Sequence, residues 1–291
     1  MNKFIERLNS GEILVTDGAT GTNLQNIGLT AGMHPEDWVF DHPEKLLNLE
    51  KAFVVAGSDI ILTCTFGGTR PRMRDAKHPT EIVELNKRAA DLARQAASSR
   101  AGVMVGGSMG PLGQLLKPYG PITYEEARAA FSEQAGALAE GGVELLVIET
   151  HYALEEADAA FEGARSVTDL PIVVSFSYDR GTRTMMGIKP EDVIKKYETR
   201  GASSVGANCG TTLENMGTIM KEYAATEAAI PLWAKPNAGT PRLVDSQTIY
   251  DITPEIMAEY ARKYIAIGAQ VVGGCCGSTP EHVAAIVKAV K

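Results

Sequence analysis

Short apolar runs alternate with longer amphipathic segments from one end of the chain to the other. Several of the runs are apolar at consecutive positions, a pattern typical of strands that are covered on both faces in a parallel sheet. We therefore expect strands at Ile13–Thr16, Asp59–Thr63, Val103–Gly106, Leu145–Ile148, Ile172–Ser175, Ser204–Ala207, Leu232–Ala234 and Val271–Val272.

The segments between these runs carry apolar residues at three- and four-residue spacing, which predicts amphipathic helices. Asp or Thr often precedes such a segment and Gly often follows it, as helix caps require. The expected helices are Leu46–Ala56, Glu81–Ala97, Tyr124–Glu140, Leu154–Ser166, Pro190–Arg200, Leu213–Ala224, Pro254–Ile267 and Pro280–Val290.

Repeated strand-then-helix units in a chain of 291 residues predict an α/β protein with a single (β/α)₈ TIM barrel. No linker, low-complexity tract or shift in composition divides the sequence, so we expect one domain over residues 1–291. A doubly wound open sheet is the alternative that the same alternation allows.

Composition and charge narrow the range of partners. The chain is 44% hydrophobic and 22% charged, as is usual for a soluble globular protein, and its net charge is −8 with scattered basic residues. This balance argues against nucleic acid or an anionic membrane as the main partner. The N-terminal segment has no signal-peptide pattern, no run is long enough for a membrane span, and four cysteines make a poor disulfide framework. We expect a cytoplasmic protein.

Three of the four cysteines lie in glycine-rich turns after two expected strands. Cys209 precedes Gly210, and the adjacent pair Cys275 and Cys276 is bracketed by glycines. In a barrel the carboxyl ends of all strands share one rim, so these thiols would meet there. A free cysteine is often just a small buried residue, but three thiolates are suitable ligands for zinc and leave its fourth position open for chemistry.

The fourth cysteine, Cys64, follows the second expected strand. As a fourth ligand it would close the metal site and make it structural. We favour instead a buried or pocket-lining thiol.

Three further strand ends carry polar candidates. The segment Asp17-Gly18-Ala19-Thr20 offers backbone amides as an anion cradle, with Asp17 beside them for a polar or cationic group. Glu149 would meet a substrate ammonium, and Asn237 would present its carbonyl oxygen to the open metal position. Their ordinary alternatives are a plain turn, a structural ion pair and a turn residue, respectively.

These segments together resemble the homocysteine S-methyltransferase family, which includes the homocysteine-binding module of cobalamin-dependent methionine synthase and betaine–homocysteine methyltransferase. The matching motifs span almost the whole chain: Asp17–Thr22, Thr63–Gly67, Glu149-Thr150, Gly206–Gly210, Lys235–Gly239 and Gly273–Gly277. The Asn-Cys-Gly and Gly-Gly-Cys-Cys-Gly motifs are the most specific of them.

The resemblance implies a zinc-dependent enzyme that moves a methyl group to the thiol of homocysteine and forms methionine. It implies that Cys209, Cys275 and Cys276 are the zinc ligands and the catalytic centre. Asp17 and Glu149 would hold the amino acid end of the substrate, with Gly18, Ala19 and Thr20 near its carboxylate. The Asn matching Asn237 can occupy the fourth zinc position until the substrate thiol displaces it.

Two departures from the family pattern bear on the reaction. Cys64 stands where methionine synthases usually carry Asn, so we expect a different pocket shape or a different acceptor thiol. No folate- or cobalamin-binding domain is attached, so a methylated corrinoid on a separate protein is the expected donor. S-methylmethionine, or another sulfonium or betaine donor, is the alternative.

Two other functions compete with methyl transfer. A non-enzyme alternative is a zinc-binding docking subunit or metal store without turnover. A zinc hydrolase is disfavoured because all-sulfur coordination makes the metal a poorer acid.

Overall fold

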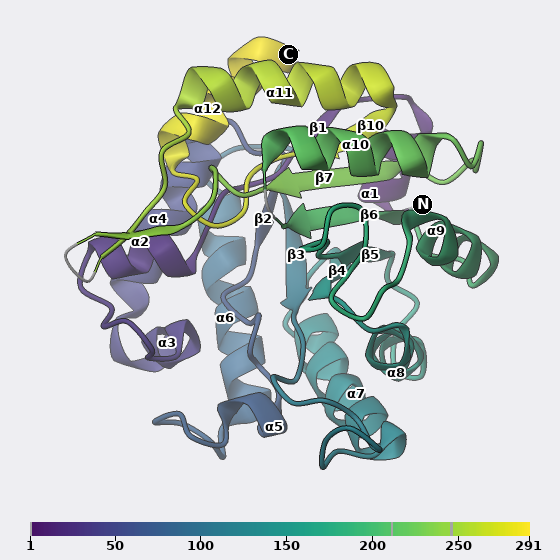
Figure 1. Ribbon diagram of the computed structural model, residues 1–291. Coiled ribbons are helices and arrows are strands. Elements are labelled where there is room, and N and C mark those ends of the chain that lie inside the picture. Colours follow the sequence, from purple (N-terminus) through teal and green to yellow (C-terminus); the bar gives the residue numbers. More distant parts are fainter. Residues whose placement is uncertain (1, 211, 245–246) are drawn as a thin grey trace.

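The centre of the molecule is a sheet of eight parallel strands (Figure 1). The computed structural model describes residues 2–210, 212–244 and 247–291. In spatial order the strands are β1 (Leu14–Val15), β10 (Ala269–Val272), β7 (Leu232–Pro236), β6 (Ser204–Cys209), β5 (Ile172–Phe176), β4 (Leu145–His151), β3 (Met104–Met109) and β2 (Ile60–Leu62). A parallel bridge between Thr16 and Ile60 joins the two outer strands and closes the sheet. The predicted barrel is confirmed, and the open-sheet alternative is wrong.

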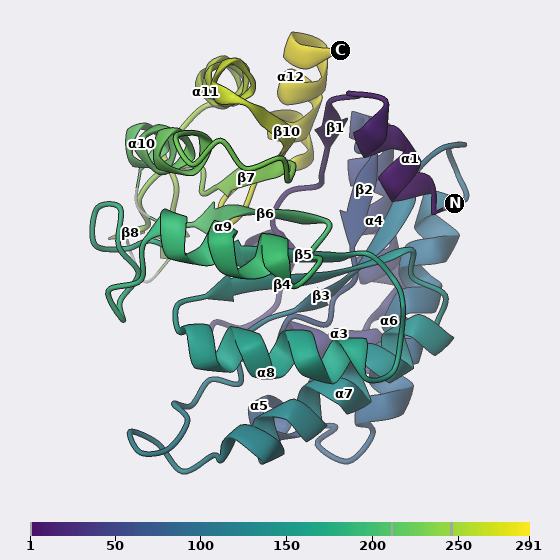
Figure 2. The ribbon, with the colours of Figure 1, turned by 90° about the vertical axis from the view of Figure 1, so that its right-hand side faces the viewer.

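In the described part of the chain, eight long helices surround this barrel (Figures 1 and 2). They are α4 (Pro43–Ala56), α6 (Ile82–Ala97), α7 (Tyr124–Glu140), α8 (Leu154–Arg165), α9 (Pro190–Thr199), α10 (Leu213–Ala224), α11 (Pro254–Ile267) and α12 (Pro280–Val290). Each corresponds to an expected helix. The first begins at Pro43 rather than Leu46, because proline is suited to the first helical position, where its missing N–H is not needed.

Local sequence signals set the ends of these helices. Thr123 caps α7 with its side chain, and Glu126 bonds back to the Thr123 backbone to complete a capping box. Gly57 ends α4 with a φ of 106°, which other residues adopt only with strain. Such signals explain why the helix boundaries could be placed closely from the sequence.

Alternate residues of each strand face opposite sides of the barrel wall. One set packs outward against the helices, for example Val15, Ile61 and Val105. The other set meets inside the barrel and includes Leu62, Val147 and Trp233. The consecutive apolar runs of the sequence therefore arise from burial on both sides.

Helix α1 (Lys3–Asn9) adds Phe4 and Leu8 to the inner cluster, and both side chains are buried. Strand β6 carries Gly206 on its inner face, beside the backbone of Trp233 on β7. A Cβ at Gly206 would lie 1.8 Å from the Trp233 carbonyl oxygen, so only glycine fits there. The barrel interior is thus a packed core that begins beneath the site described below.

Several short elements were not expected from the sequence. They are α1, α2 (Gly21–Asn26), the 3₁₀ helix η1 (Pro35–Asp37), α3 (Trp38–Asp41), α5 (Arg70–Met73) and a hairpin of β8 (Arg242–Val244) with β9 (Gln247–Ile249). All but α1 lie in connections that follow barrel strands. No helix in the described part of the chain is long and apolar enough to cross a membrane.

Candidate functional site

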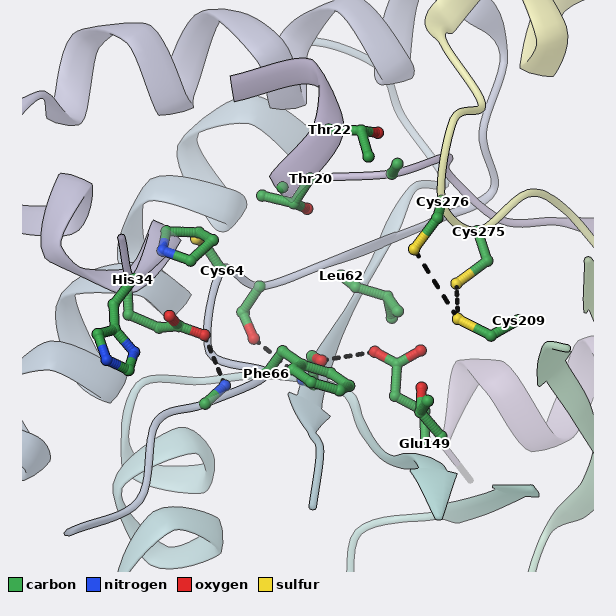
Figure 3. A pocket seen from close by; sticks show the side chains of 18 of the residues that line it. Thr20, Thr22, His34, Leu62, Cys64, Phe66, Glu149, Cys209, Cys275 and Cys276 are labelled. Atoms are coloured by element: carbon green, nitrogen blue, oxygen red, sulfur yellow. Dashed lines mark hydrogen bonds between the residues drawn. The ribbon is translucent and has the colours of Figure 1, made fainter. Parts of the chain in front are cut away.

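A pocket of about 440 Å³ opens at the carboxyl ends of the barrel strands (Figure 3). Its walls include the end of β2 at Leu62, Ser108 of β3, Glu149 of β4 and Lys235 of β7. The loop after β1 and the three clustered cysteines complete this part of the lining. The pocket therefore occupies the rim at which barrel enzymes bind their substrates.

Cys209, Cys275 and Cys276 meet in this pocket from two distant parts of the chain (Figure 3). The Cys209 sulfur lies 2.8 Å from that of Cys275 and 3.9 Å from that of Cys276, and all three sulfurs lie within 4.8 Å of one another. Zn–S bonds of about 2.3 Å in a tetrahedron place sulfurs about 3.8 Å apart. The set fits one zinc ion once the closest pair separates by about 1 Å.

The backbone around the thiols explains their convergence. Strand β6 continues to Cys209, which corrects the expectation that this residue follows its strand. Cys209 has a φ of 55° and Gly210 a φ of 80°, so the chain turns sharply at the rim. Cys275 and Cys276 follow β10, and their turn ends at Gly277 with a φ of 80°.

Hydrogen bonds couple the three thiols. Donation from Cys209 and then Cys275 stabilises a thiolate at Cys276 and lowers its pKa. The pKa of Cys209 is raised, chiefly through its contact with Cys275. The Asn208 amide N–H also approaches the Cys275 sulfur at 3.8 Å. The same side chain bonds both Thr150 and Ser175, so it ties the thiols to the neighbouring strands.

Tyr250, just after the β8–β9 hairpin, contacts the turn that carries Cys276. Its ring lies so close to Gly277 that a Cβ there would be 2.1 Å from the tyrosine Cγ. Its hydroxyl hydrogen-bonds to Cys276, and burial together with that sulfur raises the pKa of Tyr250. A glycine at position 277 is therefore needed for this contact.

Asn237 lies beside the cysteine pair. The residues on either side of Asn237 form backbone hydrogen bonds with the cysteine pair. The Cys275 N–H donates to the Pro236 carbonyl, and the Ala238 N–H donates to the Cys276 carbonyl. The Asn237 amide N–H donates to the Gly210 carbonyl at 3.1 Å. Its buried Oδ1 has no hydrogen-bond partner among the described residues. An unpaired carbonyl oxygen, on a turn whose backbone bonds to the cysteine pair, is compatible with the role of a displaceable fourth ligand.

Lys235, which lines the pocket, forms a buried ion pair with Asp17, which does not. Lys235 Nζ lies 3.0 Å from Asp17 Oδ1, and the two side chains are 3% and 4% exposed. The Leu62 N–H donates to Asp17 Oδ2 at 2.6 Å. Burial raises the pKa of Asp17 while Lys235 opposes that rise. Burial opposes the charge on Lys235, but Asp17 and Glu149 outweigh it and raise its pKa.

Glu149 presents the second carboxylate of the pocket. Its Oε1 accepts a hydrogen bond of 2.6 Å from Ser108, and no described donor reaches Oε2. Burial raises the pKa of Glu149 to about 7, against the attraction of Lys235. Figure 3 shows this side chain beside Cys209, on the same side of the pocket as the thiols.

The glycine-rich loop after β1 lines the pocket through Gly18, Ala19 and Thr20. It packs closely, because a Cβ at Gly18 would lie 2.7 Å from the Ser278 carbonyl oxygen. The N–H of Ala19 donates to that same carbonyl at 3.1 Å. At least this amide of the expected anion cradle is therefore already engaged.

Cys64 is buried and lines the pocket apart from the other thiols (Figure 3). Among the described residues, Cys64 is not part of the group that could hold a metal ion. Burial raises the pKa of its thiol, which makes it a poor ligand and nucleophile. The closed four-sulfur site considered from the sequence does not form.

Ser108, Asn208 and Lys235 were given no role from the sequence. The sequence did contain a signal for them. Because alternate residues of a strand face the same side, each of these residues lies on the inner face of its strand, and so does Glu149. Tyr250 carried no comparable signal, since its position depends on a hairpin far from the cysteines in the chain.

The fold and the site define a (β/α)₈ barrel with three thiols at its carboxyl rim that could hold a metal ion. The family model described as homocysteine S-methyltransferase matches residues 14–290. The chain therefore belongs to the homocysteine S-methyltransferase family.

Curated relatives include the methionine synthases of Mycobacterium leprae and Mycobacterium tuberculosis. They are 30% and 29% identical, and the alignments cover 96% and 97% of this chain. The chain spans about a quarter of the length of these relatives, 24% and 25% respectively.

Among solved structures, the metallated form of the homocysteine methyltransferase MmuM from Escherichia coli is similar, with a TM-score of 0.82. The match has 23% identity and covers 98% of this chain and 99% of the other. The apo form of the same protein gives a TM-score of 0.78. At this identity the likeness concerns the fold.

Proposed function

We propose that this protein is a zinc-dependent methyltransferase that methylates the thiol of homocysteine and forms methionine. The observation that carries the proposal is the meeting of three thiols, a free carboxylate oxygen and a buried ammonium in one pocket. Membership of the family and the methionine synthase relatives support the substrate. Cys209, Cys275 and Cys276 would hold zinc, with Asn237 as the displaceable fourth ligand.

Zinc, when bound, lowers the pKa of a substrate thiol so that the thiolate forms at neutral pH. The protein's own residues supply the positioning. Glu149, oriented by Ser108, offers Oε2 to the substrate ammonium, and the loop from Gly18 to Thr20 covers the amino acid end. Such positioning brings sulfur and donor methyl into attack distance.

The rest of the pocket is the proposed entry for the donor. It extends from the thiols to His34, Glu36 and Arg72, beyond the space an amino acid of this size fills. Arg72 also lines a second cavity, together with Phe66 and Thr150. We propose a methylated corrinoid as donor, with S-methylmethionine or betaine as alternatives.

A donor assay tests the proposal. Zinc-loaded protein is mixed with homocysteine and, separately, with methylcobalamin, a methylated corrinoid protein, S-methylmethionine or betaine, and methionine is measured by mass spectrometry. Methionine with one donor supports the proposal and identifies that donor. Bound zinc without methionine from any donor contradicts it and favours the docking or storage role.

A further inference from the structure

A tyrosine in the connection between β7 and α11 contacts the turn that carries the cysteine pair. The Tyr250 ring lies against Gly277, where a Cβ would be 2.1 Å from the tyrosine Cγ. The Tyr250 hydroxyl hydrogen-bonds to the sulfur of Cys276, the residue just before that glycine. Ring and hydroxyl therefore contact the same short turn at two neighbouring residues.

The fold holds the segment that follows Tyr250 in place. The Ile252 N–H donates to the Ala238 carbonyl at 3.1 Å. The Ile252 carbonyl oxygen accepts a hydrogen bond of 2.8 Å from His282 Nε2 on α12. A Cβ at Gly239 would lie 2.9 Å from Ile252 Cγ1, so glycine allows the two parts of the connection to pack closely. These contacts fix Tyr250 beside the cysteine pair.

The hydrogen bonds among the three thiols cannot persist once a metal ion binds them. As thiols, Cys209 and Cys275 donate to the sulfur of Cys276. A metal-bound cysteine is a thiolate and has lost its proton, so none of the three sulfurs can then donate to another. Among the described residues, Tyr250 is the side chain that can still donate to Cys276 in that state.

The charge of the metal site indicates what this donor does. Zinc with three thiolates carries one negative charge in excess, and a substrate thiolate adds a second. Asn208 approaches Cys275 at 3.8 Å and the Lys235 ammonium attracts the charge on that residue, whereas the Glu149 carboxylate repels a charge on Cys276. A buried anion without a donor is costly. Cys276 is therefore the ligand that depends most on a hydrogen bond from Tyr250.

We propose that Tyr250 is a positioning residue, which donates its hydroxyl to the metal-bound thiolate of Cys276 and so stabilises the zinc site when the substrate thiol joins it. The inference rests on the proposed function and adds to it a residue beyond the ligands themselves. Partners of this kind orient metal ligands and tune their donor strength. The connection between β7 and α11 then supplies both Asn237, the displaceable ligand, and the hydrogen-bond donor that remains.

Cobalt spectroscopy tests the hydrogen bond itself. Co²⁺ bound to thiolates gives sulfur-to-metal charge-transfer absorption, and a hydrogen bond to the sulfur raises its energy because it stabilises the sulfur electrons. Tyr250→Phe keeps the ring against Gly277 and removes the hydroxyl, so its bands should lie at lower energy than the native ones. Tyr260→Phe is the control, because it removes a hydroxyl bonded to Glu214 at 2.6 Å, and should keep the native bands. Native band positions in Tyr250→Phe would overturn the proposal.

The zinc-loaded protein gives the effect on ligand binding. In competition with a chromogenic chelator, Tyr250→Phe should bind zinc about 10-fold more weakly, since a partner of a metal ligand is lost. By isothermal titration calorimetry, the zinc-loaded variant should bind homocysteine about 10-fold more weakly, because the added thiolate increases the charge that the hydroxyl stabilises. Tyr260→Phe should match the native protein in both measurements. Native affinities for zinc and homocysteine in Tyr250→Phe would also overturn the proposal.

The outcomes separate this inference from the proposed function. Native protein that binds no zinc, or zinc-loaded native protein that does not bind homocysteine, would contradict the proposed function. If the native protein binds both while Tyr250→Phe keeps the native bands and affinities, the function stands and Tyr250 has no role at the metal site.

Discussion

The two ends of the barrel interior carry different kinds of side chain. At the amino end, Phe4 and Leu8 of α1 pack against inward-facing apolar residues such as Leu14 and Met104. At the carboxyl end, the inward positions carry Ser108, Glu149, Asn208 and Lys235, and the loops add the three thiols.

This difference separates stability from function. Burial of apolar side chains stabilises the amino end, whereas each buried polar group at the carboxyl end must be matched by a partner. At the carboxyl end, Lys235, Glu149 Oε2 and Asn237 Oδ1 lack a full set of described partners. The two oxygens are the atoms that we assign to substrate and metal.

The largest effect is expected at the amino end. Phe4→Ala should lower the free energy of unfolding by about 3–5 kcal/mol, because it opens a cavity in the inner cluster. Zinc stoichiometry of the folded protein should not change. Urea denaturation measures the first quantity and elemental analysis the second. Val55→Ala, at an 84% exposed position, is the control and should change stability by less than about 0.5 kcal/mol.

Removal of one thiol at the carboxyl end should impair zinc binding. Cys275→Ala should weaken zinc binding by roughly 100- to 1000-fold, since a metal site of this type draws on a few ligands of comparable weight. Competition with a chromogenic chelator measures the affinity. Cys64→Ala removes the thiol outside the cluster and should keep native affinity; an equal loss there would mean that our ligand set is wrong.

The sequence made much of this comparison predictable. Apolar runs and capping residues located all eight barrel strands and their helices, because both signals are local. The rim position of the cysteines followed from topology alone, since parallel strands bring their carboxyl ends together.

What the sequence did not reveal depends on contacts between distant segments. The Asp17–Lys235 pair joins residues 218 positions apart, and Tyr250, just after the β8–β9 hairpin, reaches Cys276. Helix α1 is too short for its periodicity to be decisive, and only packing against the strands shows its role.

A smaller effect sharpens the role of the free carboxylate. Glu149→Gln should weaken homocysteine binding about 10- to 100-fold, because a charge-assisted hydrogen bond to the ammonium is lost. Zinc binding should remain native. Calorimetry with the zinc-loaded protein provides the number, and Glu140→Gln on exposed α7 surface is the matched control. Unchanged homocysteine affinity in Glu149→Gln would rule out this contact.

The smallest effect concerns pH and His151, which is buried at the end of β4 and packs near Phe131. Burial lowers the pKa of His151 from 6.5 to about 3. Between these values the unfolded chain binds a proton that the folded protein does not. The folded protein is therefore most stable, as far as His151 is concerned, above pH 6.5. As the pH drops from 6.5 towards 3, the free energy of unfolding decreases by up to about 1.4 kcal/mol per pH unit.

Urea denaturation at pH 7 and pH 5.5 checks this dependence. His151→Gln should lose less stability between the two pH values than the native protein does. His42→Gln, with a side chain 43% exposed, should retain the native dependence. Identical pH dependence in all three proteins would show that His151 does not titrate as its burial implies.

Zinc K-edge X-ray absorption, with and without homocysteine, tests the central claim most directly. We expect one zinc per chain with three sulfur neighbours and one lighter atom, and a change to four sulfur neighbours when homocysteine is added. Protein that takes up no zinc, or zinc whose sulfur count stays the same with homocysteine present, would contradict the account.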